Sequence, residues 1–390
     1  MRSKVALALS GGGFTGYLFE IGALAALDDL FEDGFTVNEF DLYIGVSAGS
    51  AAASLIANGI SPAEIFQANV TGERPYYFER RDIFVPAMDQ GFTSMARAVR
   101  QFGAICKLYL RNRREMSLIE LLEKVQQTLP CGIYTLDPFA QYLERTFSIK
   151  GLANDFPSLP HPLYIPAIDL EDGQSVLFGD EGWQHIPISK AIIASSAAPI
   201  YFCPVRIADR DYIDAGIGRL ACFDVAPKMG VDFMVIIHPS SLIGRGGNRP
   251  RPTTTNGQPY RGFLSIADQA ARINLEARFS LALDLYIKQS PDRFFVISPQ
   301  TSEALVFDRS FLSFRDRIDL LSYGYFATVQ IIKEDFARIR AVFARHGLSI
   351  SLAKLDERIK SRLPQLAYIS ESNRQTCPGA ARRPGWSSAY

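Results

Sequence analysis

Two glycine motifs, each lying between an apolar run and a helix-like stretch, constrain the fold of this chain more than any other feature. The first is Gly11-Gly12-Gly13 with Gly16, directly after the apolar residues 5–9. The second is Gly45-Val46-Ser47-Ala48-Gly49, at the end of the apolar residues 40–46. Short uninterrupted apolar runs are typical of strands buried on both faces. The pattern therefore predicts two strands of a mostly parallel sheet, each followed by a helix.

The second motif places Ser47 where a strand turns sharply into a helix. Such a turn crowds its neighbours, so the flanking positions Gly45 and Gly49 must lack side chains. The hydroxyl then projects beside a helix N-terminus, whose unpaired N–H groups favour developing negative charge. The first motif offers further donors, since a glycine run lets the backbone approach a ligand. Either motif alone also fits an ordinary tight turn, but together they indicate a nucleophile and an oxyanion hole.

A third motif, Asp214-Ala215-Gly216, follows a strand-like run. With it, the sequence resembles the patatin-like phospholipase family, which carries Gly-Gly-Gly-x-[Arg/Lys]-Gly, Gly-x-Ser-x-Gly and Asp-Gly-[Gly/Ala]. The residues that match these patterns are 11–16, 45–49 and 214–216. Residues 167–173 and 194–202 also look like blocks of that family, and the resemblance covers roughly residues 4–239.

The resemblance implies a three-layer α/β/α fold with a mostly parallel central sheet and helical C-terminal additions. It also implies a phospholipase A- or lysophospholipase-like enzyme that cleaves carboxylic esters of lipids through an acyl-enzyme, without a metal or cofactor. In that mechanism Ser47 is the nucleophile and Asp214 its base, and no histidine takes part. The oxyanion would be held by the N–H groups of Gly11, Gly12 and Gly13.

One position departs from the family pattern. Thr15 stands where a basic residue is usual. A basic side chain beside a phosphate contributes charge-assisted hydrogen bonds. Its absence predicts a preference for esters that lack a phosphate near the scissile bond, or weaker head-group binding.

Two other readings remain open at the sequence level. Ser47, Asp214 and His238 occur in the chain order of a Ser–Asp–His esterase, and His238 ends an apolar run where a base could lie. The position beside Pro239 favours an ordinary strand-end residue instead. A non-catalytic lipid-binding module could also use the glycine loop to hold an anionic head group. Substitution of Ser47 separates an enzyme from such a binder.

The composition limits the classes of partner that we expect this chain to bind. The formal net charge is zero, so no global field favours nucleic acid, and a lipid or a membrane surface is the expected partner. The five cysteines are scattered and form no Cys-x-x-Cys pair, which favours reduced thiols. The apolar residues 5–9 are too few for a secretory signal, and no long apolar run predicts a spanning helix. We therefore expect either a cytoplasmic protein that can bind the membrane surface peripherally or one exported without a cleaved signal.

One segment suggests how such binding could occur. Residues 92–114 contain no acidic residue and six basic ones, of which all but Arg113 fall at helical spacing on one stripe, namely Arg97, Arg100, Lys107, Arg111 and Arg114. A basic amphipathic helix is typical of membrane-surface elements, although an ordinary solvated face has the same pattern. Residues 240–262 are rich in Gly, Pro, Thr and Arg and are either a lid or a plain surface insertion.

The remaining pattern predicts a catalytic domain over residues 1–300, a helical extension packed on it over 301–369, and a disordered tail over 370–390. Residues 17–31 predict a buried helix interrupted by Glu20, with Asp28 and Asp29 outside the core. Residues 320–343 predict a single long helix.

Overall fold

The structure is a computed structural model, and it describes residues 3–87, 107, 131–217, 225, 228–239, 263–299 and 317–362. Its strands are β1 (Val5–Leu9), β2 (Leu42–Gly45), β3 (Val85–Pro86), β4 (Gly132–Thr135), β5 (Leu163–Asp169), β6 (Ser175–Phe178), β7 (Ile200–Phe202), β8 (Val205–Ile207), β9 (Arg210–Asp214), β10 (Phe233–Ile237) and β11 (Phe294–Ile297). The apolar runs at residues 5–9 and 40–46 are thus strands β1 and β2, as predicted.

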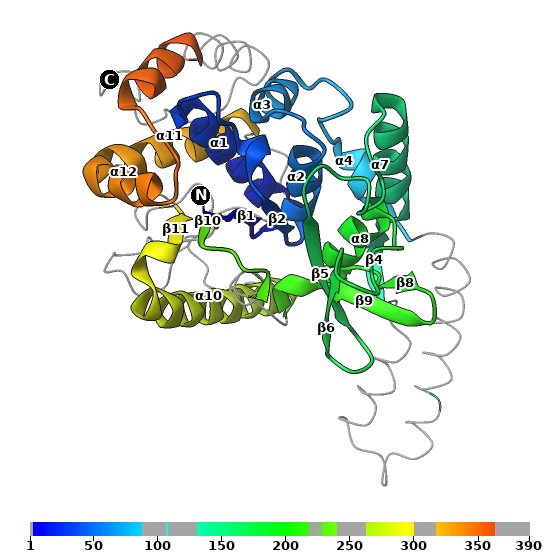
Figure 1. Cartoon of the computed structure of the whole chain (residues 1–390). Coiled ribbons are helices and arrows are strands. Elements are labelled where there is room, and N and C mark those ends of the chain that lie inside the picture. Colours follow the sequence, from blue (N-terminus) through cyan, green and yellow to red (C-terminus); the bar gives the residue numbers. More distant parts are fainter. Residues whose placement is uncertain are drawn as a thin grey trace, which may run out of the picture.

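Helices follow strands β1, β2, β4 and β6 along the first half of the chain (Figure 1). The helices are α1 (Gly13–Leu30), α2 (Ala48–Ala57), α3 (Pro62–Thr71), α4 (Arg80–Ile83), α7 (Asp137–Lys150), α8 (Ile188–Ser195), α10 (Phe263–Gln289), α11 (Arg317–Glu334) and α12 (Phe336–Arg345). Residues 352–362 are also helical. Short 3₁₀ turns lie at η1 (Val37–Glu39), η2 (Ala215–Ile217) and η3 (Pro291–Arg293).

The main sheet is mixed, with a parallel centre. Its eight strands follow the order β11-β10-β1-β2-β5-β9-β8, and β6 pairs with β5. The pairs β1–β10, β1–β2, β10–β11 and β2–β5 are parallel, whereas β5–β6, β5–β9 and β8–β9 are antiparallel. Strand β1 is central, which explains why all five of its residues are buried.

Side chains of alternate direction along β1 enter two separate hydrophobic cores, which gives the fold its three layers. Val5, Leu7 and Leu9 belong to the larger core, with residues of α1, α2, α8 and α11. Ala6 and Ala8 face the smaller core, which is closed by residues of α10. Figure 1 shows α1 and α11 on one side of β1 and β10, and α10 on the other. This arrangement confirms the predicted α/β class with helices on both faces.

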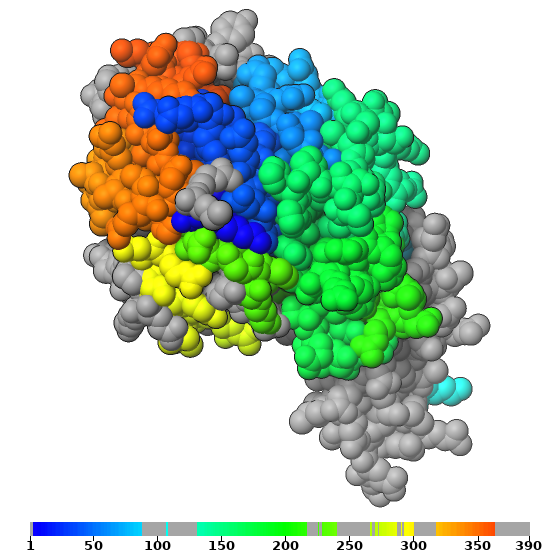
Figure 2. Space-filling view, in the orientation of Figure 1, coloured from blue at the N-terminus to red at the C-terminus, as the bar shows by residue number. Residues whose placement is uncertain are grey.

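The C-terminal helices share the larger core with α1. A Cβ on Gly22 would lie 2.2 Å from the Leu321 carbonyl oxygen, and one on Gly324 would lie 2.2 Å from that of Phe19. Only glycine at both positions lets the α1 and α11 backbones cross this closely. On the face shown in Figure 2, the C-terminal helices (orange) lie directly against the N-terminal residues (blue). The division at residue 300 stays a prediction.

Asp29 does not lie outside the core, and this prediction was wrong. Asp29 is 5% exposed, and its carboxylate receives two hydrogen bonds from Arg362, at 2.5 and 3.0 Å. The Tyr325 hydroxyl donates to the same carboxylate at 2.9 Å. The C-terminal segment thus supplies the partners that allow a charge to be buried at the end of α1. No local pattern around Asp29 encodes partners so distant in the sequence.

The predicted single helix over residues 320–343 is also wrong, because the chain breaks between α11 and α12. Asp335 leaves the helical region with φ −139° and ψ 41°. The restart directs Phe343 into the larger core, where its ring centroid lies 5.2 Å from Phe233 and 5.3 Å from Phe295. Packing of this aromatic side chain accompanies the interruption of the helix.

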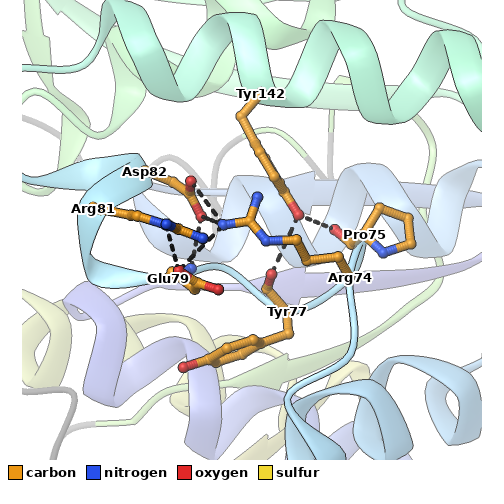
Figure 3. A network of polar contacts seen from close by, with 7 residues as sticks. All are labelled: Arg74, Pro75, Tyr77, Glu79, Arg81, Asp82 and Tyr142. Atoms are coloured by element: carbon orange, nitrogen blue, oxygen red, sulfur yellow. Dashed lines mark hydrogen bonds and ion pairs between the residues drawn. The ribbon is translucent and has the colours of Figure 1, made fainter.

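A second, three-stranded sheet β3-β4-β7 lies beside the main one. The segment before β3 is fixed by Arg74, whose guanidinium binds Asp82 at 3.0 and 3.1 Å and lies 4.9 Å from the Tyr142 ring centroid (Figure 3). The Tyr142 hydroxyl of α7 donates to the Pro75 carbonyl at 2.9 Å. Strands β3 and β4 are antiparallel, so the chain leaves at Ala87 and returns beside it before β4.

Several predicted segments lie outside the described residues: the basic stripe of 92–114 apart from Lys107, the possible lid at 240–262 and the tail at 370–390. Lys107 itself is helical and exposed. Among the helices that the structure describes, none has both the length and the apolar character needed to cross a bilayer.

Candidate active site

Sheet register brings the predicted site residues to one edge of the sheet. In β1, Leu9 pairs with Gly45 of β2 on one side and with Ile237 of β10 on the other. The residues that follow these three strands therefore emerge together at their carboxyl ends, which is where α/β folds bind ligands. Ser10, Ser47 and His238 all lie just past this edge.

The backbone turns sharply at Ser47, between β2 and α2. Ser47 adopts φ 52° and ψ −131°, a region that non-glycine residues rarely occupy. A Cβ on Gly45 would lie 2.4 Å from Ser50 Cα, and a Cβ on Gly49 would lie 2.7 Å from the Leu9 carbonyl oxygen. Neither position tolerates a side chain, because α2 packs directly against the ends of β1 and β2.

Ser47 and Asp214 are joined by a direct hydrogen bond. The Ser47 hydroxyl donates from Oγ to Asp214 Oδ2 at 2.6 Å, and the N–H of Gly216 donates to Oδ1 at 2.8 Å. Asp214 ends β9 and is 7% exposed. Burial raises the pKa of Asp214 from 3.8 to about 6, and the bonds from Ser47 and Gly216 oppose this rise. The carboxylate is thus both more basic than usual and in contact with the hydroxyl.

Ser195 supports this pair from α8, and no sequence argument assigned it a role. Its Oγ accepts the Ser47 N–H at 2.9 Å, and its side chain is fully buried. Two residues later, the Ala197 carbonyl accepts the Asp214 N–H at 3.1 Å. The block 194–202, which resembled the family, therefore holds Ser47 and Asp214 at the same time. That block was the signal that could have suggested the role of Ser195.

The glycine loop lies against the elbow. A Cβ on Gly11 would lie 2.4 Å from the Val46 carbonyl oxygen, and Gly11, Gly12 and Gly13 all have positive φ, at 78°, 106° and 68°. Three consecutive residues in the left-handed region require glycine. The N–H groups of Gly12 and Gly13 have no acceptor in the described part of the chain, and Gly12 is exposed.

The Gly11 N–H, in contrast, is already used inside the protein. It donates to Glu20 Oε1 at 2.7 Å, and the Glu20 side chain is fully buried. Burial raises the pKa of Glu20 well above its ordinary value. The Gly11 N–H thus points into the protein because Glu20 of α1 accepts it, a different use from the oxyanion donor that the sequence predicts. The sequence showed Glu20 only as a polar interruption of an apolar helix.

Thr15, at the position of the family's basic residue, is 2% exposed. Its hydroxyl lies 3.5 Å from the Gly12 carbonyl oxygen. The side chain packs within the first turn of α1 and presents no charge to the edge of the sheet.

His238 follows β10 at the same edge but does not contact Ser47 or Asp214 through its ring nitrogens. Its Nδ1 faces Ser10 Oγ at 2.7 Å, and its Nε2 faces Glu276 Oε1 at 3.1 Å. No histidine lies between Ser47 Oγ and Asp214 Oδ2, since these atoms are themselves hydrogen-bonded. Within the described ranges, no group of three or more His, Cys, Asp or Glu side chains is placed to hold a metal ion.

Comparison with known proteins relates the chain to one family. The family model for patatin-like phospholipase matches residues 7–225. No curated protein sequence matches significantly. Among solved structures, VipD from Legionella pneumophila is similar at 13% identity and a TM-score of 0.36, over 86% of this chain and 67% of VipD. ExoU, in its complex with SpcU from the type III secretion system of Pseudomonas aeruginosa, is similar at 15% identity and a TM-score of 0.36. That match covers 85% of this chain, which spans about half of the ExoU chain, at 52%.

Proposed function

The chain belongs to the patatin-like phospholipase family, hydrolases that act on carboxylic ester bonds of lipids, and we propose that it cleaves them with Ser47 as nucleophile and Asp214 as base. The observation that carries this proposal is the 2.6 Å hydrogen bond from Ser47 Oγ to Asp214 Oδ2 at the strained elbow. A nucleophile in contact with a base of raised pKa is the arrangement that serine hydrolysis needs.

The reaction proceeds in two halves. Ser47 Oγ attacks the ester carbonyl carbon, its proton passes to Asp214, and the tetrahedral intermediate collapses as Asp214 returns the proton to the leaving alkoxide. The alcohol departs and the acyl group remains esterified to Ser47. Water then attacks the acyl-enzyme, with Asp214 taking its proton and giving it to Ser47 as the fatty acid leaves.

The oxyanion of both intermediates is held by the N–H groups of Gly12 and Gly13 at the start of α1. These two groups have no acceptor within the described residues, and they precede a helix whose dipole favours negative charge. Gly11 contributes differently, because its N–H fixes the loop to Glu20.

The dyad explains the geometry better than a Ser–Asp–His triad. In a triad the histidine would lie between the hydroxyl and the carboxylate, whereas Ser47 binds Asp214 directly. Both ring nitrogens of His238 face other partners.

The test is lipid hydrolysis by purified wild type, Ser47→Ala and Asp214→Asn on a panel of lipid classes. Both substitutions should lower kcat by about 10⁴- to 10⁶-fold, as for members of a catalytic unit. A Ser47→Ala protein that still turns over lipid would refute the nucleophile. A wild type that binds vesicles but hydrolyses no ester would favour a non-catalytic lipid-binding module.

We further propose that the preferred ester lacks a phosphate beside the scissile bond. Thr15 is buried, so no cation is supplied at the position where the family usually has one. The ratio of kcat/KM for a neutral acylglycerol to that for a phospholipid of the same acyl chains measures this preference. A ratio below one contradicts it.

Contact with an anionic lipid surface is assigned to the basic stripe. The stripe belongs to the segment that leaves at Ala87 and returns before β4, and Lys107 within it is exposed. Each cation near an anionic surface contributes about 1 kcal/mol, and 1 M salt shortens the Debye length to about 3 Å. Replacement by Gln at Arg97, Arg100 and Lys107 should reduce co-sedimentation with anionic vesicles at low salt but not at 1 M. Equal binding by the variant at low salt would remove the assignment.

A further inference from the structure

A buried polar chain links α10 to the glycine loop, and the proposed reaction does not use it. Ser10, the residue directly before Gly11, contacts His238 Nδ1 through its Oγ at 2.7 Å. The other ring nitrogen contacts Glu276 Oε1 at 3.1 Å. His238 is 3% exposed and Glu276 is 6% exposed. The imidazole also stacks on Phe279 of α10, with centroids 3.6 Å apart and planes 4° from parallel.

The Ser10 hydroxyl has two neighbours that limit where its proton can be. Its Oγ lies 3.1 Å from the Ile237 carbonyl oxygen as well as 2.7 Å from His238 Nδ1. A hydroxyl donates one proton, and a carbonyl only accepts. Both contacts can be hydrogen bonds at the same time only when the Ser10 hydroxyl donates to the Ile237 carbonyl oxygen and His238 Nδ1–H donates to Ser10 Oγ. In that arrangement Nδ1 cannot take a proton from Ser10, so the pair is a clamp and Ser10 is not an activated nucleophile. The Nε2 contact with Glu276 Oε1 is then a hydrogen bond when a further proton lies between these two atoms, on the ring or on the carboxyl group.

The same short segment also lies beside the loop on the far side of Gly11. A Cβ on Gly12 would lie 3.9 Å from Pro239 Cβ, and one on Gly16 would lie 3.4 Å from Pro239 Cγ. The Ser10 N–H donates to the Ile237 carbonyl at 3.1 Å. Residues 237–239 therefore support both ends of the loop that holds the proposed oxyanion donors.

We propose that His238 is a positioning residue that holds the oxyanion loop in place through Ser10, with Glu276 of α10 fixing the orientation of its ring. The proposal rests on the Ser47–Asp214 function above, because it assigns His238 to the loop that serves that reaction. Three consecutive glycines in the left-handed region have no side chains to restrain them. Contacts at the ends of the loop must therefore set the direction of the Gly12 and Gly13 N–H groups.

The expected effect follows from the sensitivity of oxyanion donors to placement. Removing one donor outright costs about 10²- to 10³-fold in kcat. Loosening the loop should cost less, about 10- to 50-fold, and it should affect kcat with little change in KM, since the donors act mainly in the transition state.

The experiment compares two amides at position 238. Asparagine places its amide N–H near the position of Nδ1 and can still donate to Ser10, whereas glutamine reaches toward the position of Nε2 and Glu276. Hydrolysis of a short-chain p-nitrophenyl ester gives kcat and KM for wild type, His238→Asn, His238→Gln, Ser10→Ala and the Ser10→Ala/His238→Gln double variant. Circular dichroism and the thermal midpoint identify any variant that fails to fold. Ser10→Ala is the smallest change and tests the clamp without altering the ring.

His346 provides a matched control in the same chain. Its ring stacks on Phe233 with centroids 4.6 Å apart, its Nδ1 contacts Ser3 Oγ at 3.1 Å, and its Nε2 contacts the Asp292 carbonyl oxygen at 3.1 Å. It thus has a similar set of partners but does not adjoin the glycine loop. His346→Gln should alter stability at most and leave kcat near that of wild type.

We expect kcat to fall about 10- to 50-fold in His238→Gln and in Ser10→Ala. The double variant should show no further loss, and His238→Asn should keep a clearly higher kcat than His238→Gln. It is overturned if folded Ser10→Ala retains the wild-type kcat, or if Asn and Gln are equivalent. Loss in His238→Gln and His238→Asn as complete as in Ser47→Ala overturns it in favour of the triad. Hydrolysis that persists in Ser47→Ala overturns the proposed function itself, and the positioning inference with it.

Discussion

Replacement of Asp214 by asparagine should abolish hydrolysis and at the same time stabilise the fold. Burial raises the pKa of Asp214 from 3.8 to about 6, a difference of about two units. At about 1.4 kcal/mol per unit, this corresponds to about 3 kcal/mol. That free energy is the cost of keeping a charged carboxylate in its buried position, and an uncharged amide does not incur it.

The sign of the effect sets its pH dependence. The pKa of Asp214 in the folded state lies above its unfolded value, so the stability from this group is fully present below about pH 4 and is lost as pH rises through 6. Asp214→Asn should therefore differ little from wild type in unfolding free energy near pH 4 and exceed it by about 3 kcal/mol at pH 8. Urea unfolding at pH 4, 6 and 8 measures this difference, with the exposed Asp209→Asn as control. A difference that does not grow with pH, or an asparagine variant less stable at pH 8, would show that the buried Asp214 carboxylate does not destabilise the fold.

Three further outcomes follow from the same structure. Wild-type kcat/KM should fall about tenfold per pH unit below about pH 6, because Asp214 must be unprotonated to accept the proton; a flat profile from pH 7 to 4 contradicts this. Gly49→Ala should lower kcat and reduce the free energy of unfolding by more than about 3 kcal/mol, since its Cβ would clash with backbone atoms. Gly151→Ala, where no atom lies within 4 Å of the new Cβ, should reduce the free energy of unfolding by about 1 kcal/mol. Arg362→Met should lower the free energy of unfolding in urea by about 3–5 kcal/mol, because it leaves the buried carboxylate of Asp29 without its cation. The exposed Arg338→Met should lower it by less than about 1 kcal/mol, and equal losses in the two variants would contradict this.

The structural elements that could be predicted from the sequence are those that depend on residues close together along the chain. Strands β1 and β2 are recognisable because apolar runs, glycine turns and helix starts follow one another within a few residues. The Ser47 elbow is predictable for the same reason. The resemblance to a known family, rather than any periodicity, paired Ser47 with Asp214.

What the sequence did not reveal depends on contacts between distant segments. Glu20 interrupts an apolar helix, and only the folded backbone shows that its carboxyl group accepts the Gly11 N–H. Asp29 looked solvent-exposed because Arg362 lies at the other end of the chain. The partners of His238 come from the residue after β1 and from α10. From the sequence alone, His238 could be either a catalytic base or an ordinary strand-end residue, and only the contacts of both ring nitrogens distinguish the two.

Covalent labelling with a fluorophosphonate, followed by mass mapping of the modified peptide, shows directly whether Ser47 is the nucleophile. The reagent phosphonylates an activated serine and releases fluoride, so it reports the nucleophile independently of any lipid preference. We expect one adduct, on Ser47, which is absent in Ser47→Ala and forms much more slowly in Asp214→Asn. An adduct on Ser10, or labelling of Ser47 at an undiminished rate in Asp214→Asn, would contradict the Ser47–Asp214 dyad.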